Sequence, residues 1–244
     1  MKTRVFLAIL LLTVVAILYC SDDPSENTEY QRKTRELKAL SDRFKAETGF
    51  EGTIENNPEL MILSKFTGSF KDIDMKNVTD SLSTRIVFDD VLNKLLPFIS
   101  APKNQLEKYE LRSSSGTTRI RYYQTVNGYS IEGLGFINIA YDKNRDLFTI
   151  MNVTVNVQQT TVTNIISEEA AFKIARTAFE QTEYCNELTP TWRSKTVIQY
   201  KSRQVNGKAQ PYRLCWRVTF PGLSYYIDAE TSEWFHEGYV INDL

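Results

Sequence analysis

The sequence predicts an α+β protein built from two successive units, each a helix followed by antiparallel strands. Three observations lead to this prediction. Residues 117–157 alternate apolar and polar side chains around an Asn-Gly dipeptide, helical apolar patterns precede strand patterns in both halves, and a polar, threonine-rich stretch at 158–164 separates the halves. With 244 residues, 42% of them hydrophobic, the chain is long enough for one or two folded cores.

The first twenty residues read as a signal peptide. A basic start precedes the apolar run Val5 to Leu18, as in secretory leaders, and the run is shorter than the ~20 apolar residues of a typical membrane span. Leu18-Tyr19-Cys20 is a weak lipobox, which makes Cys20 a lipidation candidate, although Tyr19 stands where a small residue is preferred. Ordinary cleavage after Ala16 or Cys20 fits as well, and an uncleaved anchor is a further alternative. Each route places the folded part outside the cytoplasm, as a secreted protein or a membrane-anchored lipoprotein.

Two helices are predicted in the first half. Residues 21–27 are polar, and 29–48 follow as a helix that ends before Gly49. Residues 60–66 resemble a short strand and 72–84 a polar loop, and the second helix is predicted at 86–99. The residues expected to face inward are Leu37, Leu40 and Phe44 on the first helix and Phe88, Val91, Leu92 and Leu95 on the second.

A three-stranded meander follows. Ile120, Tyr122, Gln124 and Val126 share one face of the first strand, and Asn127-Gly128 is a strong hairpin signal because both residues tolerate positive φ. The second strand is expected at about 129–141 and the third at 147–157. The third strand is predicted to turn one side toward a covering helix, namely Leu147, Met151, Val153, Val155 and Val157.

The second half repeats the pattern. Ser167 is expected to cap a helix with Glu168 and Glu169 in its first turn. Strands are predicted at 196–201, 212–220, 225–228 and 234–241, with turns at Asn206-Gly207 and Pro221-Gly222. The expected buried stripe of the helix is Ala171, Ile174, Ala175 and Phe179.

Two cysteines follow the leader, Cys185 and Cys215. An even pair in an exported chain favours a disulfide, which would offset the small core of the second half. Two free buried thiols are the alternative.

Composition argues against several classes of function. The 29 basic and 30 acidic residues nearly cancel, whereas nucleic-acid binding needs clustered positive charge. The single histidine, His236, excludes a His-Glu-x-x-His zinc motif, and a Ser-His or Cys-His hydrolase would have to use it. We therefore expect no catalytic residues, no metal and no cofactor, and a non-enzymatic protein.

The first half resembles the propeptide domain of fungalysin and thermolysin metallopeptidases, the FTP domain. Members often carry histidine where this chain has Arg119 and proline where it has Ser130. The second half resembles a PepSY domain, although Ser232 replaces the glycine common after the aspartate-alanine turn. The matching residues are Gly116, Arg121, Gln124, Gly128, Ile131 and Gly133 in the first half, and 167–170, 216–218 and 225–229 in the second.

The resemblance implies two cystatin-like units, each an antiparallel curved sheet packed on a helix. The expected boundaries are a leader at 1–20, a polar segment with a helix at 21–48, an FTP-like domain at 49–157, a linker at 158–164 and a PepSY-like domain at 165–244. Such propeptides assist the folding of their peptidase and inhibit it. Because no peptidase follows in this sequence, we expect a stand-alone protein that binds a secreted metallopeptidase as an inhibitor, a folding chaperone or both. The alternative is a cell-surface binding module with a non-peptidase ligand.

Seven side chains are candidates for partner binding, either because they belong to the family motif or because aromatic residues often anchor interfaces. The competing interpretation is that the polar ones solvate the sheet or bind loop carbonyls, and that the aromatic ones pack in the core. The candidates are Arg119, Arg121, Gln124, Tyr225, Tyr226, Trp234 and His236.

Overall fold

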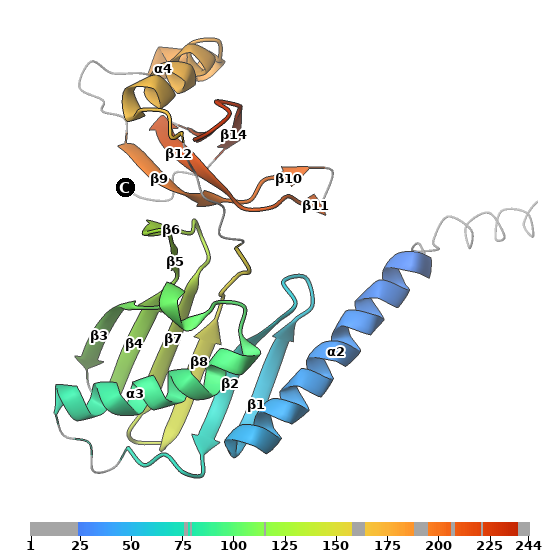
Figure 1. Ribbon diagram of the computed structural model, residues 1–244, viewed down its shortest axis with the longest axis vertical. Coiled ribbons are helices and arrows are strands. Elements are labelled where there is room, and N and C mark those ends of the chain that lie inside the picture. Colours follow the sequence, from blue (N-terminus) through green and yellow to red (C-terminus); the bar gives the residue numbers. More distant parts are fainter. Residues whose placement is uncertain are drawn as a thin grey trace, which may run out of the picture.

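Two antiparallel sheets, each with helices against one face, make up the body of the protein in the computed structural model (Figure 1). The structure describes residues 24–75, 78, 80–114, 116–157, 164–187, 195–205, 208–220 and 222–238. The α+β class predicted from the sequence is confirmed at this level. The leader with Cys20 and residues 158–163 of the expected linker lie outside the described residues.

The first sheet has six strands in the order β1-β2-β8-β7-β4-β3. All neighbours are antiparallel. The strands are β1 (Phe50–Asn57), β2 (Ile62–Phe70), β3 (Lys108–Ser114), β4 (Thr117–Tyr123), β7 (Phe136–Asp142) and β8 (Leu147–Asn152). The predicted meander corresponds to β4, β7 and β8, whereas β1 and β3 were not predicted and the strand expected at 60–66 is the start of the longer β2.

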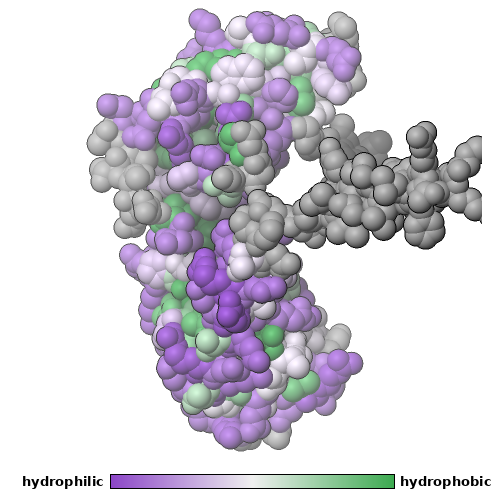
Figure 2. Space-filling model, turned by 90° about the vertical axis from the view of Figure 1, so that its right-hand side faces the viewer, coloured by the Kyte–Doolittle hydropathy of each residue, from purple (hydrophilic) through white to green (hydrophobic). Residues whose placement is uncertain are grey.

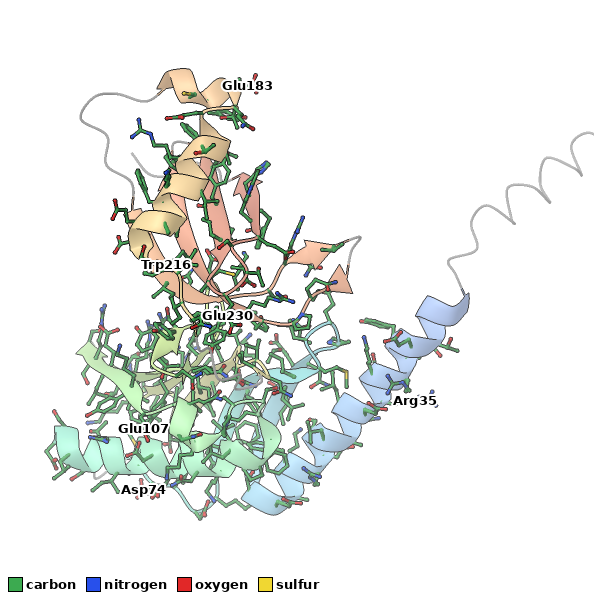
Figure 3. The ribbon with its side chains drawn as sticks, turned by 45° about the horizontal axis from the view of Figure 1, so that its top comes forward. Arg35, Asp74, Glu107, Glu183, Trp216 and Glu230 are labelled. Atoms are coloured by element: carbon green, nitrogen blue, oxygen red, sulfur yellow. The ribbon has the colours of Figure 1, made fainter. Side chains whose placement is uncertain are left out.

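Two helices cover one face of this sheet. Helix α2 (Pro24–Thr48) runs beside β1, and its N-terminal part points away from the body, where Arg35 lies (Figures 1 and 3). Leu37 and Phe44 of α2 are buried as predicted. Exposed ion pairs one turn apart, such as Arg32–Glu36 at 2.6 Å, line the outer part of the helix. Among the described residues, we found no helix with the length and apolar character needed to span a membrane.

Helix α3 (Ser81–Leu95) begins five residues before the predicted start. The carboxylate of Asp80 accepts hydrogen bonds from the backbone N–H groups of Leu82 and Ser83, both at 2.9 Å. This N-cap starts the helix inside the stretch expected to be a loop. The four residues predicted to face inward are buried, and the short turns η1 (Leu96–Phe98) and η2 (Lys103–Gln105) follow.

The phase of the third meander strand is the reverse of the predicted one. Phe148 and Ile150 of β8 face the helices and are buried, whereas Met151 is 43% exposed on the other side. The bulk of the even-numbered side chains decides the orientation, because two large residues fill the core better than Leu147 and Met151. Val155 and Val157 are buried, but beyond the end of β8 and in a different cluster.

The predicted second strand is interrupted. The short strand β5 (Thr125–Val126) pairs with β6 (Tyr129–Ser130). The turn between them is formed by Asn127 and Gly128, which have φ of 51° and 83°. Gly133 and Gly135 then adopt φ of 70° and 77°, values that favour glycine. They bend the chain between β6 and β7.

The second sheet has four strands in the order β14-β13-β12-β9, with helix α4 (Glu168–Phe179) on one face. Ser167 caps α4 as predicted, because its Oγ accepts the N–H of Ala170 at 3.2 Å. The rings of Phe179 and Phe220 stack at 4.4 Å in this core. The strands are β9 (Lys195–Lys201), β12 (Arg213–Phe220), β13 (Leu223–Asp228) and β14 (Trp234–Gly238), with a small arm of β10 (Gln204–Val205) and β11 (Lys208–Ala209), and η3 (Glu183–Glu187) follows α4.

A third apolar cluster joins the halves. Val126, Ile131 and Val155 from the first half pack with Tyr200 and Leu214 from the second. Ile131 forms a parallel bridge with Tyr200, and the next residue, Glu132, donates its N–H to the Tyr200 carbonyl at 3.0 Å. The chain at 131–132 therefore extends the second sheet beyond β9. Trp216, which contributes to both the α4 core and the joining cluster, lies near this junction (Figure 3).

Candidate functional site

The alternation of side chains along β13 and β14 divides the predicted aromatic residues between two faces of the second sheet. Tyr225 is paired with His236 in the ladder, and Tyr226 with Phe235. Tyr225 packs in the α4 core, so Trp234 and His236 lie on the α4 side. Tyr226 lies on the opposite face. The structure therefore brings three of the seven candidates together and separates the fourth aromatic one.

Trp234 and His236 are the accessible members of this group. Trp234 is 45% exposed and His236 is exposed. Their rings lie 5.7 and 5.6 Å from the ring of Tyr225 and 6.2 Å from each other. A groove of about 340 Å³ between α4 and β14 is bounded by Trp234 and by Lys173, Ile174 and Thr177 of the helix. We call Trp234, His236 and this groove the β14 surface.

Tyr225 is the buried residue on which the Trp234 and His236 rings of the β14 surface pack. Its ring is fully buried against Phe179 and Phe220. Burial raises the pKa of its hydroxyl above the ordinary tyrosine value, and within the described part of the chain that hydroxyl has no hydrogen-bond partner. Tyr225 is therefore a core residue, as the competing interpretation of the sequence held.

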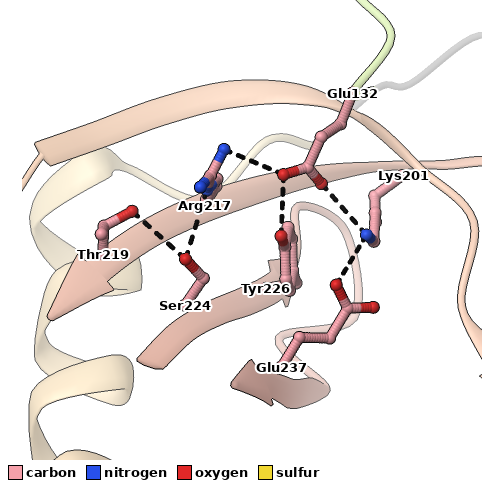
Figure 4. Close-up of polar contacts among 7 residues, drawn as sticks. All are labelled: Glu132, Lys201, Arg217, Thr219, Ser224, Tyr226 and Glu237. Atoms are coloured by element: carbon pink, nitrogen blue, oxygen red, sulfur yellow. Dashed lines mark hydrogen bonds and ion pairs between the residues drawn. The ribbon is translucent and has the colours of Figure 1, made fainter. Parts of the chain in front are cut away.

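Tyr226 belongs to a polar cluster on the opposite face (Figure 4). Its hydroxyl donates to Oε1 of Glu132 at 2.8 Å, and Arg217 contacts the same oxygen at 2.9 Å. Nζ of Lys201 lies 3.3 Å from Oε2 of Glu132 and 2.8 Å from Glu237. Burial, and then the bond to Glu132, raise the pKa of Tyr226 far above its ordinary value. The cluster is a joint between the halves, because Glu132 comes from the first half and its partners from the second.

Sequence reasoning did not find this joint. Alternation along residues 129–132 could indicate that Ile131 points inward and Glu132 outward. No local pattern links Glu132 to Tyr226, which is 94 residues away. The contact arises only because the 131–132 segment lies along β9.

The predicted disulfide between Cys185 and Cys215 is wrong, since both cysteines are free. Cys215 is paired with Asp228 in the β12–β13 ladder, so its thiol lies on the face away from α4, whereas Cys185 packs against the α4 core. The sheet separates the two sulfur atoms. Burial, with a smaller contribution from Asp228, raises the pKa of Cys215 to about 12, which keeps this thiol protonated and a poor nucleophile at neutral pH.

Arg119 and Arg121 lie on the face of the six-stranded sheet away from the helices. Arg119 is exposed and stands opposite Arg112 and Ala140. The guanidinium of Arg121 lies 4.8 Å from the centre of the Phe136 ring, an arrangement that is favourable for a cation on an aromatic face. These two arginines lie in the six-stranded sheet, whereas the β14 surface belongs to the four-stranded sheet.

Gln124 has a structural role. Its side chain is 1% exposed, and its amide donates to Gln105 and to the Val155 carbonyl, both at 2.8 Å. Its carbonyl accepts the N–H of Val155 at 3.1 Å. Gln124 thus ties β4 to the segment that follows β8, and it is unavailable to a partner.

The surface in Figure 2 is largely hydrophilic, with apolar residues in small separate patches. Over the described ranges, no group of three or more His, Cys, Asp or Glu side chains is placed to hold a metal ion.

Comparisons with known proteins leave the family open. No protein-family model matches the sequence, and no curated protein is similar to it. Among solved structures, the protein is similar to the C-terminal domain of YpeB from Bacillus megaterium, with a TM-score of 0.31 and 12% sequence identity. The similarity covers 82% of this chain and 95% of the other. A TM-score this low does not establish a shared function.

Proposed function

We propose that this chain is an exported, non-catalytic protein that binds a thermolysin-like metallopeptidase and acts on it as an inhibitor, a folding chaperone or both. The observation that carries the proposal is the β14 surface, where Trp234 is 45% exposed on a strand backed by a packed core. Tryptophan is over-represented among residues that dominate binding energy. We also propose that the two halves are cystatin-like units, the first of them FTP-like and the second PepSY-like.

The position of β14 in its sheet supports the same role. Among the described strands, β14 pairs only with β13. An edge strand can accept an extended segment of another protein through main-chain hydrogen bonds, with specificity from alternate side chains. Trp234 and His236, on one side of β14, would supply that specificity. The C-terminal segment from Trp234 onward would then approach the active-site cleft of the peptidase.

Binding can be measured directly between the purified protein and secreted thermolysin-like peptidases from the same source. We expect Trp234→Ala to weaken binding about 30-fold, which corresponds to about 2 kcal/mol for a buried aromatic anchor. Tyr30→Ala is the matched control, because Tyr30 is an exposed aromatic residue on α2. Failure of the wild-type protein to bind any of these peptidases would falsify the proposal.

Peptidase activity and refolding yield separate the two modes of action. An inhibitor lowers the turnover of the folded enzyme, whereas a chaperone raises the yield of active enzyme after dilution from denaturant. Trp234→Ala should reduce whichever effect is seen, and Tyr30→Ala should preserve it.

Export is part of the proposal, with lipidation at Cys20 and plain secretion as its two alternative forms. Mass spectrometry of the mature N-terminus distinguishes a lipid-modified Cys20 from cleavage after Ala16 or Cys20. A protein recovered in the cytoplasm with its leader intact would contradict export.

A second candidate function is a cell-surface binding module with a non-peptidase ligand. The observation that favours it is a separate pocket of about 220 Å³ in the second half, lined by both charged and aromatic side chains. Affinity capture from the cell envelope separates the candidates, because recovery of a metallopeptidase supports the first.

A further inference from the structure

The 220 Å³ pocket lies beside the β10–β11 arm, between that arm and the turn that leads into β14. Its walls carry three cationic and two acidic side chains together with Phe235, whose side chain lies on the face of the sheet away from α4. The volume is below the ~300–1,000 Å³ typical of sites for drug-sized ligands. The size therefore suits a ligand of one or two amino-acid residues.

Most of the charges in the pocket are already neutralised. Lys201 is shared by Glu132 and Glu237, as described above. Arg213 lies 3.1 Å from Asp228. Although burial alone would raise the pKa of Asp228, the backbone N–H groups of Thr231 and Glu230 and the Arg213 guanidinium lower it below its ordinary value. These groups make up the wall of the pocket and leave little charge for a ligand.

The two charged side chains of the pocket not yet described are Arg203 and Glu233. Both are exposed, and neither forms an ion pair with another described residue. The guanidinium of Arg203 lies 5.1 Å from the centre of the Phe235 ring. Stacking uses the flat face of a guanidinium and leaves its in-plane N–H donors available for a carboxylate. The rim thus presents one cation and one anion beside an aromatic surface.

We infer that this pocket binds a small zwitterion with an apolar side chain, such as a free α-amino acid or a short peptide with unblocked ends. Arg203 would bind the carboxylate through paired N–H donors, and Glu233 would bind the ammonium group. The apolar side chain would lie against Phe235. The inference does not depend on the proposed peptidase partner, since it concerns the protein alone.

Four compounds test the charge requirement: L-phenylalanine, N-acetyl-L-phenylalanine, L-phenylalaninamide and glycine. Binding is followed by calorimetry and by backbone amide chemical shifts, with Phe235 as the reporter within the pocket. We expect L-phenylalanine to bind at least tenfold more tightly than each of the others, because each lacks one of the three recognised groups.

Two substitutions assign the charges. Arg203→Gln should abolish the preference for L-phenylalanine over the amide and keep the preference over the N-acetyl compound. Glu233→Gln should abolish the preference for L-phenylalanine over the N-acetyl compound and keep the preference over the amide. Arg176→Gln is the matched control, because Arg176 is an exposed arginine on α4 that pairs with Glu180, and it should leave all four affinities unchanged.

The inference is overturned if L-phenylalanine does not bind at millimolar concentration, or if it binds no better than the singly charged compounds. It is also overturned if the shifts map away from Phe235, or if neither substitution changes the order of affinities. Circular dichroism confirms that each variant is folded before its affinities are compared.

Discussion

At the scale of single residues, Ser232 has a backbone conformation that its side chain disfavours. It has φ of 62° in the turn between β13 and β14, and its N–H donates to the Asp228 carbonyl at 3.1 Å. A left-handed conformation costs a residue with a Cβ about 1–2 kcal/mol. Glycine avoids that cost.

Ser232→Gly should therefore stabilise the protein by about 0.5–1 kcal/mol, after part of the gain is lost to the greater freedom of glycine in the unfolded chain. Urea unfolding measures the change. Ser130→Gly, in the exposed extended strand β6, is the control and should destabilise by about 0.5–1 kcal/mol. A loss of stability in Ser232→Gly would contradict the strain argument.

The two cysteines should differ in reactivity. With a pKa of about 12 for Cys215, about one thiol in ten thousand is ionised at pH 8, and the thiolate is the reactive form. Iodoacetamide at pH 8 should label the half-buried Cys185 in the folded protein and Cys215 only after unfolding. Peptide mass spectrometry reads out both sites, and a cross-linked 185–215 peptide in unreduced protein would refute the assignment of free thiols.

At the scale of elements, a pair of glycines allows β1 and β2 to lie close together. Gly52 and Gly68 stand directly opposite each other in the ladder. A Cβ on Gly68 would lie 2.1 Å from the carbonyl oxygen of Glu51, and one on Gly52 would lie 2.2 Å from that of Thr67. Both obstacles are backbone atoms, so no side chain can move aside.

Gly68→Ala should accordingly destabilise the protein by about 2–3 kcal/mol, as overpacking of tight sites does. Ser69→Ala is the control, because Ser69 is the neighbouring half-buried residue of β2, and it should cost little. Hydrogen exchange should locate the loss in β1 and β2. If both variants unfold at the same urea concentration, the close approach of the strands is not a constraint.

The sequence predicted elements well where local signals were strong. Apolar stripes identified α2, α3 and α4, and the dipeptide Asn127-Gly128 identified its hairpin, because these signals depend on residues a few positions apart. The edge strands β1 and β3 carry weak alternation and were missed. The phase of β8 failed because Met151 and Phe148 are both apolar, and only packing decides which one is buried.

For the site, alternation correctly placed Gln124 on the same face as Ile120 and Tyr122, which leaves Arg119 and Arg121 on the other face. It could not show which aromatic residues would be exposed, since Tyr225 and Trp234 are both aromatic residues in predicted strands. The structure distinguishes them by position, because β13 is a central strand and β14 lies at the edge. Central strands are covered on both sides by neighbours, whereas edge strands keep accessible side chains.

At the scale of the whole molecule, buried tyrosines make stability depend on alkaline pH. Burial, and then hydrogen bonds to Asp89 and Glu132, raise the pKa values of Tyr122 and Tyr226 well above that of a free phenol. Unfolded tyrosine titrates near pH ~10. The folded state therefore holds more protons above that pH, so this contribution to stability is full below pH ~10 and is lost as pH rises further. Cys215 should begin the loss near its ordinary value of 9.0.

We expect the urea midpoint to be flat from pH 7 to 9 and to fall above that range. Tyr226→Phe should reduce the slope of the fall, because one raised phenol is removed, and Tyr30→Phe should leave it unchanged, since Tyr30 is exposed. A midpoint that stays constant up to pH 11 would show that these groups ionise at the same pH in the folded and unfolded protein, which contradicts raised pKa values in the folded state.

The arrangement of the two halves should depend on Glu132. Its carboxylate is mostly buried and contacts Tyr226, Arg217 and Lys201 across the junction. Removing one partner of a buried charged network leaves the others uncompensated. Glu132→Ala should therefore destabilise the protein by about 2–3 kcal/mol, whereas Glu237→Ala, which removes a more exposed partner of Lys201, should cost less.

Hydrogen exchange separates loss of the joint from general unfolding. In Glu132→Ala, protection should fall first in 129–132 and 195–201, where the halves meet, while α3 and α4 keep theirs. A double-mutant cycle with Tyr226→Phe should give a coupling energy of about 1 kcal/mol or more, since the two groups share a buried hydrogen bond. If Glu132→Ala leaves exchange at the junction unchanged, then Val126, Ile131, Tyr200 and Leu214 fix the halves through apolar contact alone, and the polar cluster only fills the space beside them.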